Sequence, residues 1–364
     1  MHEKGFEVIA VSAHGSEIKE IEEREGVKHF VVPFTRTISP IKDLMALAKL
    51  IRLMISLKPH IVHTHTPKAG LLGMIAAYLS RVPVRMHTVA GLPVMEAQGF
   101  TRKILTFTES LTYKCASKIY PNSFQLKEWI VRNIGPSQSK ISVIGNGTSN
   151  GIDTNYYSID RSIEQKALDI RQELRIDSSE KVLVFVGRLV RDKGIVELIK
   201  AFNLLNSQSL HLVLVGGYED ERDPVPEETK ALIEKKTNIK AVGFQKDIRP
   251  YLALADIFVF PSYREGFPNV VLQALSMGLC CIVTDINGCN EVISHGINGL
   301  IVKPKDSESL QKALMEILSN DKLFKTMSEN ARSSVVDKYE QKKYWKMLLM
   351  EYKRALSKNV PEYS

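Results

Sequence analysis

The sequence predicts an α/β protein made of two doubly wound domains, each a parallel sheet covered by helices. The chain has 364 residues, more than a single hydrophobic core usually accommodates. Near-continuous apolar runs of strand length alternate with helical patterns in both halves, as expected of strands buried on both faces of a sheet. A turn-prone segment rich in Gly, Asn and Ser, residues 145–158, separates the two series.

The first series opens with an anomaly. Residues 1–5, MHEKG, have the character of a helix end that leads into a strand, whereas a doubly wound domain usually opens with a strand, a tight loop and a helix. We therefore expect this domain to lack its first strand and helix. Of two explanations, an incomplete chain or a start inside a longer reading frame, we favour the second; a chain that truly starts here should be poorly stable and turn over slowly. Apolar runs predict the following strands at 6–13, 29–34, 59–66, 82–91 and 140–147, and apolar periodicity predicts helices at 40–57 and 69–80.

The second series shows the same alternation of strand and helix patterns, and each apolar run is followed by a helix or loop. The predicted strands are 181–189, 210–217, 239–244, 256–262 and 279–285. A strongly amphipathic helix is predicted at 339–356. Since ligands of doubly wound folds bind beyond the carboxyl ends of the strands, the cleft between the two sheets is the expected site.

Composition is typical of a soluble globular protein, with 44% hydrophobic and 25% charged residues. No apolar run reaches the ~18–20 residues that cross a bilayer, because Lys49 and Arg52 interrupt the best candidate, residues 44–57. The N-terminus makes a poor signal peptide. Four cysteines without C-x-x-C spacing predict buried thiols in a reducing cytoplasm rather than a metal site.

Charge is distributed unevenly. Residues 1–150 hold 19 Lys and Arg against 11 Asp and Glu, whereas the remainder holds 30 of each. The excess is greatest in residues 36–140, with 15 basic and 4 acidic residues. The basic half predicts an anionic partner, such as a membrane face or a phosphorylated substrate, or else a solvated basic surface. No nucleic-acid-binding module is present in the sequence.

The stretch PSYREGFPNVVLQALSMG, residues 261–278, predicts a strand end followed by a short helix. Pro268 suits a first helical position and Gly278 a helix end. Glu265, just before the helix, could accept hydrogen bonds from sugar hydroxyls or could simply cap the helix dipole. Unpaired N–H groups at the helix start suit phosphate or sugar oxygens, and they belong to Gly266, Phe267 and Asn269.

A second stretch, residues 185–202, runs from a strand through Gly187 and Arg188 to Lys193 and Gly194, where a helix opens. Two cations beside a helix N-terminus would form a diphosphate clamp. The alternative is an ordinary loop with solvated charges.

Taken together, these stretches resemble the retaining glycosyltransferases of family four, which have the GT-B fold. The residues that carry the resemblance are GRLVRDKG, GGYEDERDP and PSYREGFPNVVLQALSMGLCCIVTDINGCNEVI, with HTHTPKAGLLG (63–73) and HTVAGLP (87–93) in the first half. Within this family, the sequence most resembles bacterial enzymes of capsule, O-antigen and lipid-linked oligosaccharide assembly. The resemblance implies two Rossmann-like domains facing a central cleft, a UDP-sugar donor and metal-independent transfer, and the sequence contains no D-x-D motif.

The resemblance also implies roles for the donor site. Arg188 and Lys193 match a diphosphate-binding pair, and Glu265 matches the first acid of an E-x7-E motif, which contacts the donor sugar. Gln273 stands where the family usually has a second glutamate that binds the ribose; an amide oxygen still accepts a hydrogen bond, without charge assistance. Backbone groups of the loop and helix start would hold the sugar and phosphates: Gly266, Phe267, Asn269 and Val270.

In the first half, His87 lies three residues before Ala90-Gly91, where relatives often have His-Gly, so it is either a catalytic neighbour of the donor or a plain strand residue. His65 and Lys68 end another strand and are expected at the acceptor; a solvated loop lysine is the alternative for Lys68. A zinc reading of His63 and His65 lacks a third ligand. The acids Glu219, Glu221 and Asp223 are taken as a structural surface loop.

The resemblance implies three segments: an acceptor-binding domain at 1–155, a nucleotide-sugar-binding domain at 156–335, and a C-terminal helix at 336–364 that packs back on the first domain. A membrane-surface helix is the alternative for the third. The predicted enzyme moves a hexosyl or N-acetylhexosaminyl group from a UDP-sugar to a polyprenyl-diphosphate-linked glycan, at the cytoplasmic membrane face. The rival hypotheses are a GT-B UDP-sugar epimerase and a degenerate, non-catalytic GT-B protein.

Overall fold

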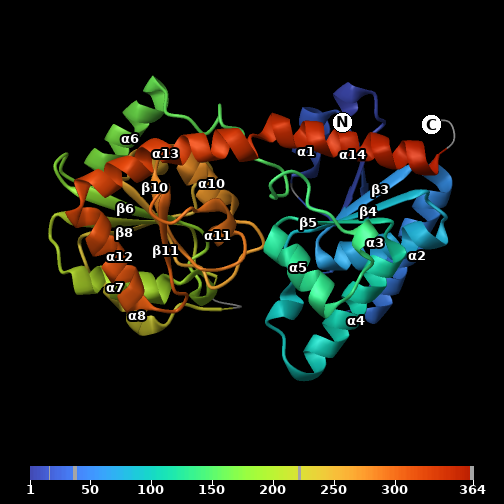
Figure 1. Ribbon diagram of the computed structural model, residues 1–364, viewed down its shortest axis with the longest axis horizontal. Coiled ribbons are helices and arrows are strands. Elements are labelled where there is room, and N and C mark those ends of the chain that lie inside the picture. Colours follow the sequence, from blue (N-terminus) through green and yellow to red (C-terminus); the bar gives the residue numbers. More distant parts are fainter. Residues whose placement is uncertain (16, 36–38, 220–222, 361–364) are drawn as a thin grey trace. The chain divides into compact units, whose positions relative to one another are not determined.

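The computed structural model describes residues 1–15, 17–35, 39–219 and 223–360 (Figure 1). The chain divides into two compact units. The first consists of Met1–Ser149 with Trp345–Ser364, and the second of Asn150–Tyr344. The boundary at Ser149 lies inside the Gly/Asn/Ser-rich segment 145–158.

The second unit is built on a six-stranded parallel sheet in the order β11-β10-β9-β6-β7-β8. The order reverses at β6, because the chain first builds outward through β7 and β8 and then returns to build β9, β10 and β11 on the other side. This is the doubly wound arrangement with its topological switch point between β6 and β9. The strands are β6 (Lys181–Val186), β7 (Leu210–Val215), β8 (Ile239–Gly243), β9 (Ile257–Phe260), β10 (Cys280–Thr284) and β11 (Gly299–Val302).

Helices cover both faces of this sheet (Figure 1). On one face α7 packs against α8 and α12, and on the other α10 packs against α13. All side chains of β7 and β9 are therefore buried, which explains their uninterrupted apolar runs. The helices are α6 (Arg161–Glu173), α7 (Ile195–Leu205), α8 (Glu227–Lys235), α9 (Arg249–Ala253), α10 (Asn269–Ser276), α11 (Cys289–Val292), α12 (Ser307–Ser319) and α13 (Asp321–Tyr339).

The first unit contains two parallel sheets, one of two strands, β1-β2, and one of three, β3-β4-β5. Helices α2, α3 and α4 lie next to one another beside the three-stranded sheet, with α3 packed against both neighbours. The strands are β1 (Ile9–Ser12), β2 (Lys28–Val31), β3 (Ile61–His65), β4 (Val84–Val89) and β5 (Lys118–Pro121), and the helices are α1 (Ile18–Glu25), α2 (Pro40–Leu57), α3 (Pro67–Leu79), α4 (Gly99–Cys115) and α5 (Phe124–Asn133).

The last helix, α14 (Gln341–Asn359), contributes residues from Trp345 onward to the first unit. The hydroxyl of Tyr352 lies 2.6 Å from Nδ1 of His63 on β3. The hydroxyl of Tyr120 on β5 donates to Glu351 over 3.0 Å. These side chains join the amphipathic C-terminal segment to the carboxyl half of the three-stranded sheet.

Most predicted strands and helices are confirmed, and the bounds of α2 are those predicted. The predicted strand 140–147 is wrong: Ile141 makes a single bridge to Ile119, and the chain then turns through Gly145 and Gly147 at positive φ. The run is apolar, as expected of a strand, but only Ile141 pairs with β5 before the chain turns away. Two short strands escaped prediction, β5 and β11, because four residues carry too little periodicity to stand out. The opening segment 1–5 contains a 3₁₀ helix at His2–Lys4.

All four cysteines are free and buried, as predicted. Across the described parts of the chain, no helix combines the length and the apolar character that a membrane span requires.

Candidate donor site at the carboxyl edge of the second sheet

Three loops meet at the carboxyl edge of the second sheet because β9, β6 and β7 are adjacent strands. The loop after β6 carries Arg188 and Lys193, the loop after β7 carries Glu219, and the loop after β9 carries Glu265. Since the strands are parallel, all three loops leave the sheet on the same side.

Two glycines permit the close approach of these loops. A Cβ atom on Gly216, whose φ is 146°, would lie 1.9 Å from the carbonyl oxygen of Gly187. A Cβ atom on Gly194, whose φ is 73°, would lie 2.0 Å from the carbonyl oxygen of Pro261. Backbone therefore packs on backbone, and any side chain at these positions would force the loops apart.

We expect Gly194→Ala to lower the free energy of unfolding by at least about 2 kcal/mol, since left-handed strain adds to a backbone clash. Gly278→Ala is the matched control, because Gly278 also has positive φ (85°) but its added Cβ would meet nothing within 4 Å. Scanning calorimetry of both variants provides the comparison. Equal losses for the two variants would show that the contact with Pro261 contributes nothing.

Lys193 and Glu265 form an ion pair through Nζ and Oε1, with only 15% and 17% of their side chains exposed. The carboxylate also accepts a 3.1 Å hydrogen bond from Oγ of Ser262. A pair this secluded from water is held more firmly than a surface pair, because the solvent screens it less. The structure thus brings together two residues that the sequence separates by 72 positions.

Asn287, which follows β10, holds the loop around Glu265 in shape. Its amide nitrogen donates to the carbonyl oxygens of Glu265 (3.2 Å) and Gly266 (2.8 Å). These two hydrogen bonds fix the conformation of the loop that leads from Glu265 into α10. Asn287 is not among the site residues predicted from the sequence, although an Asn-Gly pair shortly after a buried strand is a turn signal.

Arg188 is paired with Glu219 at 2.7 Å, and about half of each side chain is exposed. This pair is open to solvent, so an anion at the loop edge can compete for the guanidinium. The neighbouring Glu221 of the acidic loop lies outside the described residues.

The first turn of α10 comes directly after the loop that carries Glu265. Pro268 caps the helix rather than occupying its first position, one residue from the prediction. Intrahelical bonds begin with Val271 donating to the carbonyl of Pro268, so the N–H groups of Asn269 and Val270 precede them. Phe267 is buried, with its ring 5.5 Å from that of Tyr339, and it offers only its backbone to a ligand.

Gln273, on α10, contacts Tyr157 of the same unit. Its amide nitrogen donates to the hydroxyl of Tyr157 over 2.8 Å. This contact orients the side-chain amide and directs its donor toward Tyr157. The sequence could not anticipate Tyr157, because 116 positions separate the two residues.

His87, in the first unit, is buried, with 1% of its surface exposed. Its Nδ1 lies 2.8 Å from Oγ1 of Thr64, and its ring packs so closely on α3 that a Cβ on Gly70 would lie 2.3 Å away. Burial lowers the pKa of His87 to about 4, so the ring is neutral near pH 7. This enclosed position supports the strand-residue interpretation, and we assign His87 no catalytic part.

The other N-terminal candidates lie at the carboxyl end of β3 and the start of α3. The rings of His63 and His65 stack with centroids 4.5 Å apart, and His63 Nε2 lies 2.8 Å from Oγ1 of Thr88. Burial lowers the pKa of His63 well below its ordinary value. Lys68 pairs with Asp43 of α2 at 2.7 Å. Among the described residues, no group of three or more His, Cys, Asp or Glu side chains is placed to hold a metal ion.

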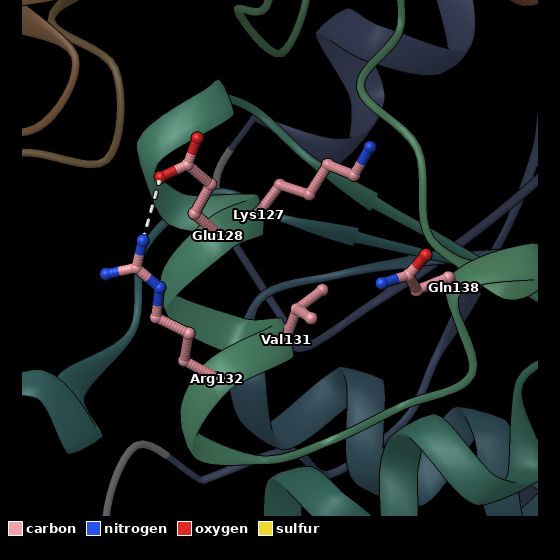
Figure 2. Close-up of a pocket in the computed structure, with 5 residues that line it drawn as sticks. All are labelled: Lys127, Glu128, Val131, Arg132 and Gln138. Atoms are coloured by element: carbon pink, nitrogen blue, oxygen red, sulfur yellow. Dashed lines mark ion pairs between the residues drawn. The ribbon is translucent and has the colours of Figure 1, made fainter.

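A surface depression in the first unit lies apart from all of these residues. Figure 2 shows its lining, which comes from α5 and from Gln138. Glu128 and Arg132 form an exposed ion pair at 3.8 Å, of the kind that contributes little. None of the predicted site residues lines it, so we assign it no role.

Comparison with known sequences identifies both units. The family described as "Glycosyl transferase 4-like domain" matches residues 1–147, and the family described as "Glycosyl transferases group 1" matches residues 167–334. A capsular polysaccharide biosynthesis glycosyltransferase of Staphylococcus aureus, CapM, is 31% identical over 362 residues, which cover 99% of this chain and 93% of the relative. The chain belongs to glycosyltransferase family four. It is a retaining glycosyltransferase.

Other relatives of this glycosyltransferase act on lipid-linked glycans. One, from Escherichia coli, is named a UDP-Gal:alpha-D-GlcNAc-diphosphoundecaprenol alpha-1,3-galactosyltransferase; it is 31% identical, over 86% of this chain and 80% of its own length. Among solved structures, HepE of Anabaena in complex with UDP superposes with a TM-score of 0.80, covering 95% of this chain and 99% of its own, at 20% identity. The glycosyltransferase therefore has the GT-B fold, with two parallel-sheet domains.

Proposed function

We propose that this glycosyltransferase moves a hexosyl or N-acetylhexosaminyl group from a UDP-sugar to a glycan carried on a polyprenyl diphosphate. The observation that carries the proposal is the secluded pair of Lys193 and Glu265 at the carboxyl edge of the second sheet, directly before α10. A cation suited to a diphosphate and an acid suited to sugar hydroxyls stand side by side there. The names of the curated relatives support the choice of donor and acceptor.

Each residue of the site has a proposed part. Arg188 and Lys193 bind the diphosphate and neutralise the charge that grows on departing UDP when the bond to the anomeric carbon breaks. Glu265 accepts hydrogen bonds from hydroxyls of the donor sugar. The N–H groups at the start of α10 face the remaining oxygens, supported by the positive end of the helix dipole.

Gln273 takes the place of the ribose-binding acid. Because Tyr157 engages its amide nitrogen, its carbonyl oxygen is the group left to accept a hydrogen bond from a ribose hydroxyl. The acceptor is assigned to the first unit, near His65 and Lys68, which follow the carboxyl end of β3. The basic composition of residues 36–140 fits work at the anionic inner face of the plasma membrane.

In the structure, both cations are paired with carboxylates of the protein itself, Lys193 with Glu265 and Arg188 with Glu219. A donor diphosphate would replace these carboxylates as the partner of the cations. The site is thus balanced in charge without a donor, and binding exchanges one set of ion pairs for another.

A thermal-shift titration with UDP, GDP and ADP, which measures the stability of the folded protein, tests the donor site. UDP at ~100-fold over its Kd should add roughly 2.7 kcal/mol to the stability of the folded state, and the other nucleotides should add less. Arg188→Ala should abolish the stabilisation by UDP. Lys200→Ala, which replaces an exposed lysine on α7, should leave this stabilisation intact. A cooperatively melting protein that ignores all three nucleotides would overturn the proposal.

A further inference from the structure

Three neighbouring helices of the first unit present large apolar side chains to solvent. Helix α3 packs between α2 and α4, and the three lie side by side in Figure 1. Ile41 is 78% exposed, Phe100 77% and Phe107 68%. We call this the α2–α4 face; its large exposed apolar residues are Ile41, Leu44, Met45, Ile55, Leu57, Tyr78, Leu79, Phe100, Ile104 and Phe107.

Helix α2 is apolar on two opposite sides. Ala46, Leu50 and Met54, spaced four residues apart, form its buried stripe. Ile41 and Ile55 are nine residues before and five residues after Leu50, which at 3.6 residues per turn places both on the far side of the helix. The inner stripe supports the fold, and the outer stripe has no part in the core of the unit.

Helix α4 repeats the arrangement. Phe100, Ile104 and Phe107 follow the i, i+4, i+7 spacing of one helix face, and all three are exposed. At the end of α3, Tyr78 and Leu79 are exposed by 56% and 58%. Clustered apolar exposure on three adjacent helices differs from the scattered exposure that any soluble protein shows.

The exposed charges on the three helices are all of one sign. The three helices, every residue of which is described, contain two acids: Asp43, which is mostly buried and paired with Lys68, and Glu109, which is buried. The exposed charged residues are all basic: Lys42, Lys49, Arg52, Arg102, Lys103 and Lys114. On these three helices, apolar and cationic side chains are therefore exposed together, without an exposed acid.

We propose that the α2–α4 face is the surface through which the protein inserts into an anionic lipid bilayer. Apolar side chains gain by leaving water for the acyl boundary, while lysine and arginine remain at the headgroups and contribute on the order of 1 kcal/mol each. The inference deepens the proposed function, on which it rests for the membrane-bound acceptor. It adds which helices, and which side chains on them, meet the lipid.

Two other occupants fit the face less well. A nucleic acid would suit the cations but would leave the isoleucine and phenylalanine side chains without an apolar partner. A second copy of the chain would cover the apolar residues but would bring six cations against the same six, which is unfavourable. An anionic bilayer satisfies both sets of side chains at once.

Vesicle flotation measures the binding directly. Wild-type protein should float with vesicles containing phosphatidylglycerol, and should float less with pure phosphatidylcholine or at high salt. Leu44→Gln/Ile55→Gln on α2 and Phe100→Gln/Phe107→Gln on α4 should each lower the partition coefficient by about tenfold or more. Lys49→Glu/Arg52→Glu should lower it by a similar factor on the anionic vesicles alone.

The matched control is Leu204→Gln/Met315→Gln, which removes two apolar residues of similar exposure, 53% each, from the second unit. It should float like the wild type. Unchanged flotation of the α2 and α4 variants would overturn the inference, as would a dimer that these variants dissociate, without vesicle binding, in analytical ultracentrifugation. No sugar donor is present in the experiment, so its outcome does not depend on whether the donor site works.

Discussion

Replacing Lys193 with alanine should lower the rate of sugar transfer by about 10²–10³-fold. In the proposed mechanism the ammonium stabilises charge that develops as UDP leaves, so its loss should lower kcat more than it raises KM. Steady-state kinetics with a UDP-sugar and a lipid-linked acceptor provide the measurement. Lys200→Ala, a solvent-facing lysine on the helix that follows the loop, should leave both constants unchanged.

The ion pair complicates a single substitution, because removing Lys193 leaves the largely shielded Glu265 without its cation. We therefore expect Lys193→Ala, Glu265→Gln and the double variant to be non-additive, as for residues that act together. A Lys193→Ala enzyme with wild-type kcat, in a protein that still melts cooperatively, would remove Lys193 from the catalytic site.

The second large effect concerns stability rather than catalysis. Burial raises the pKa of Glu109 on α4 to about 7, from an ordinary value of 4.5. Its Oε2 atom is buried and has no hydrogen-bond partner among the described residues. The folded state therefore holds a proton between about pH 4.5 and 7 that the unfolded state has released, and the contribution of Glu109 to stability falls as the pH rises through this window.

Glu109→Gln should remove this dependence and raise the free energy of unfolding at pH 8 by about 2 to 3 kcal/mol relative to the wild type. At pH 4 the two proteins should be nearly equal. Urea titrations followed by tryptophan fluorescence are suitable, because both tryptophans, Trp129 and Trp345, belong to the first unit.

The control is Glu128→Gln, an exposed acid of the same unit, which should leave the pH dependence intact. The comparison with Glu109→Gln is made at each pH, because the lowered pKa values of the buried His63 and His87 make the same unit more stable as the pH rises toward 6.5. A difference in stability between the two proteins that stays constant between pH 5 and 8 would show that Glu109 ionises as it does in water.

Much of the fold follows from local pattern. The apolar runs of β6, β7, β9 and β10 reflect burial on both faces, which is a property of the residues themselves. Helix α2 begins and ends where its apolar periodicity does. The prediction of a strand at 140–147 failed because an apolar run shows burial but not strand pairing. Ile141 and Ile144 are buried, yet they lie in a loop.

The proposed donor site also combines features that the sequence predicted with contacts that it did not. Sequence spacing singled out Arg188, Lys193, Glu265 and the start of α10, because a cation or acid at a strand end before a helix is a local pattern. Their partners are not local. Glu219 follows β7 and Asn287 follows β10, and the strand order β10-β9-β6-β7 places both next to the loops after β6 and β9. Tyr157 precedes α6 and reaches Gln273 only through the packing of the unit.

The sequence by itself determined the fold class, the two series of strands and the residue types at the proposed donor site, because these depend on periodicity and spacing along the chain. The tertiary structure decided what long-range packing controls. It buried His87 against Gly70, joined Lys68 to Asp43, and left one side of α2 and α4 apolar and exposed. Periodicity shows that a helix has an apolar stripe, but which stripe faces the core is settled only when the neighbouring helices are in place.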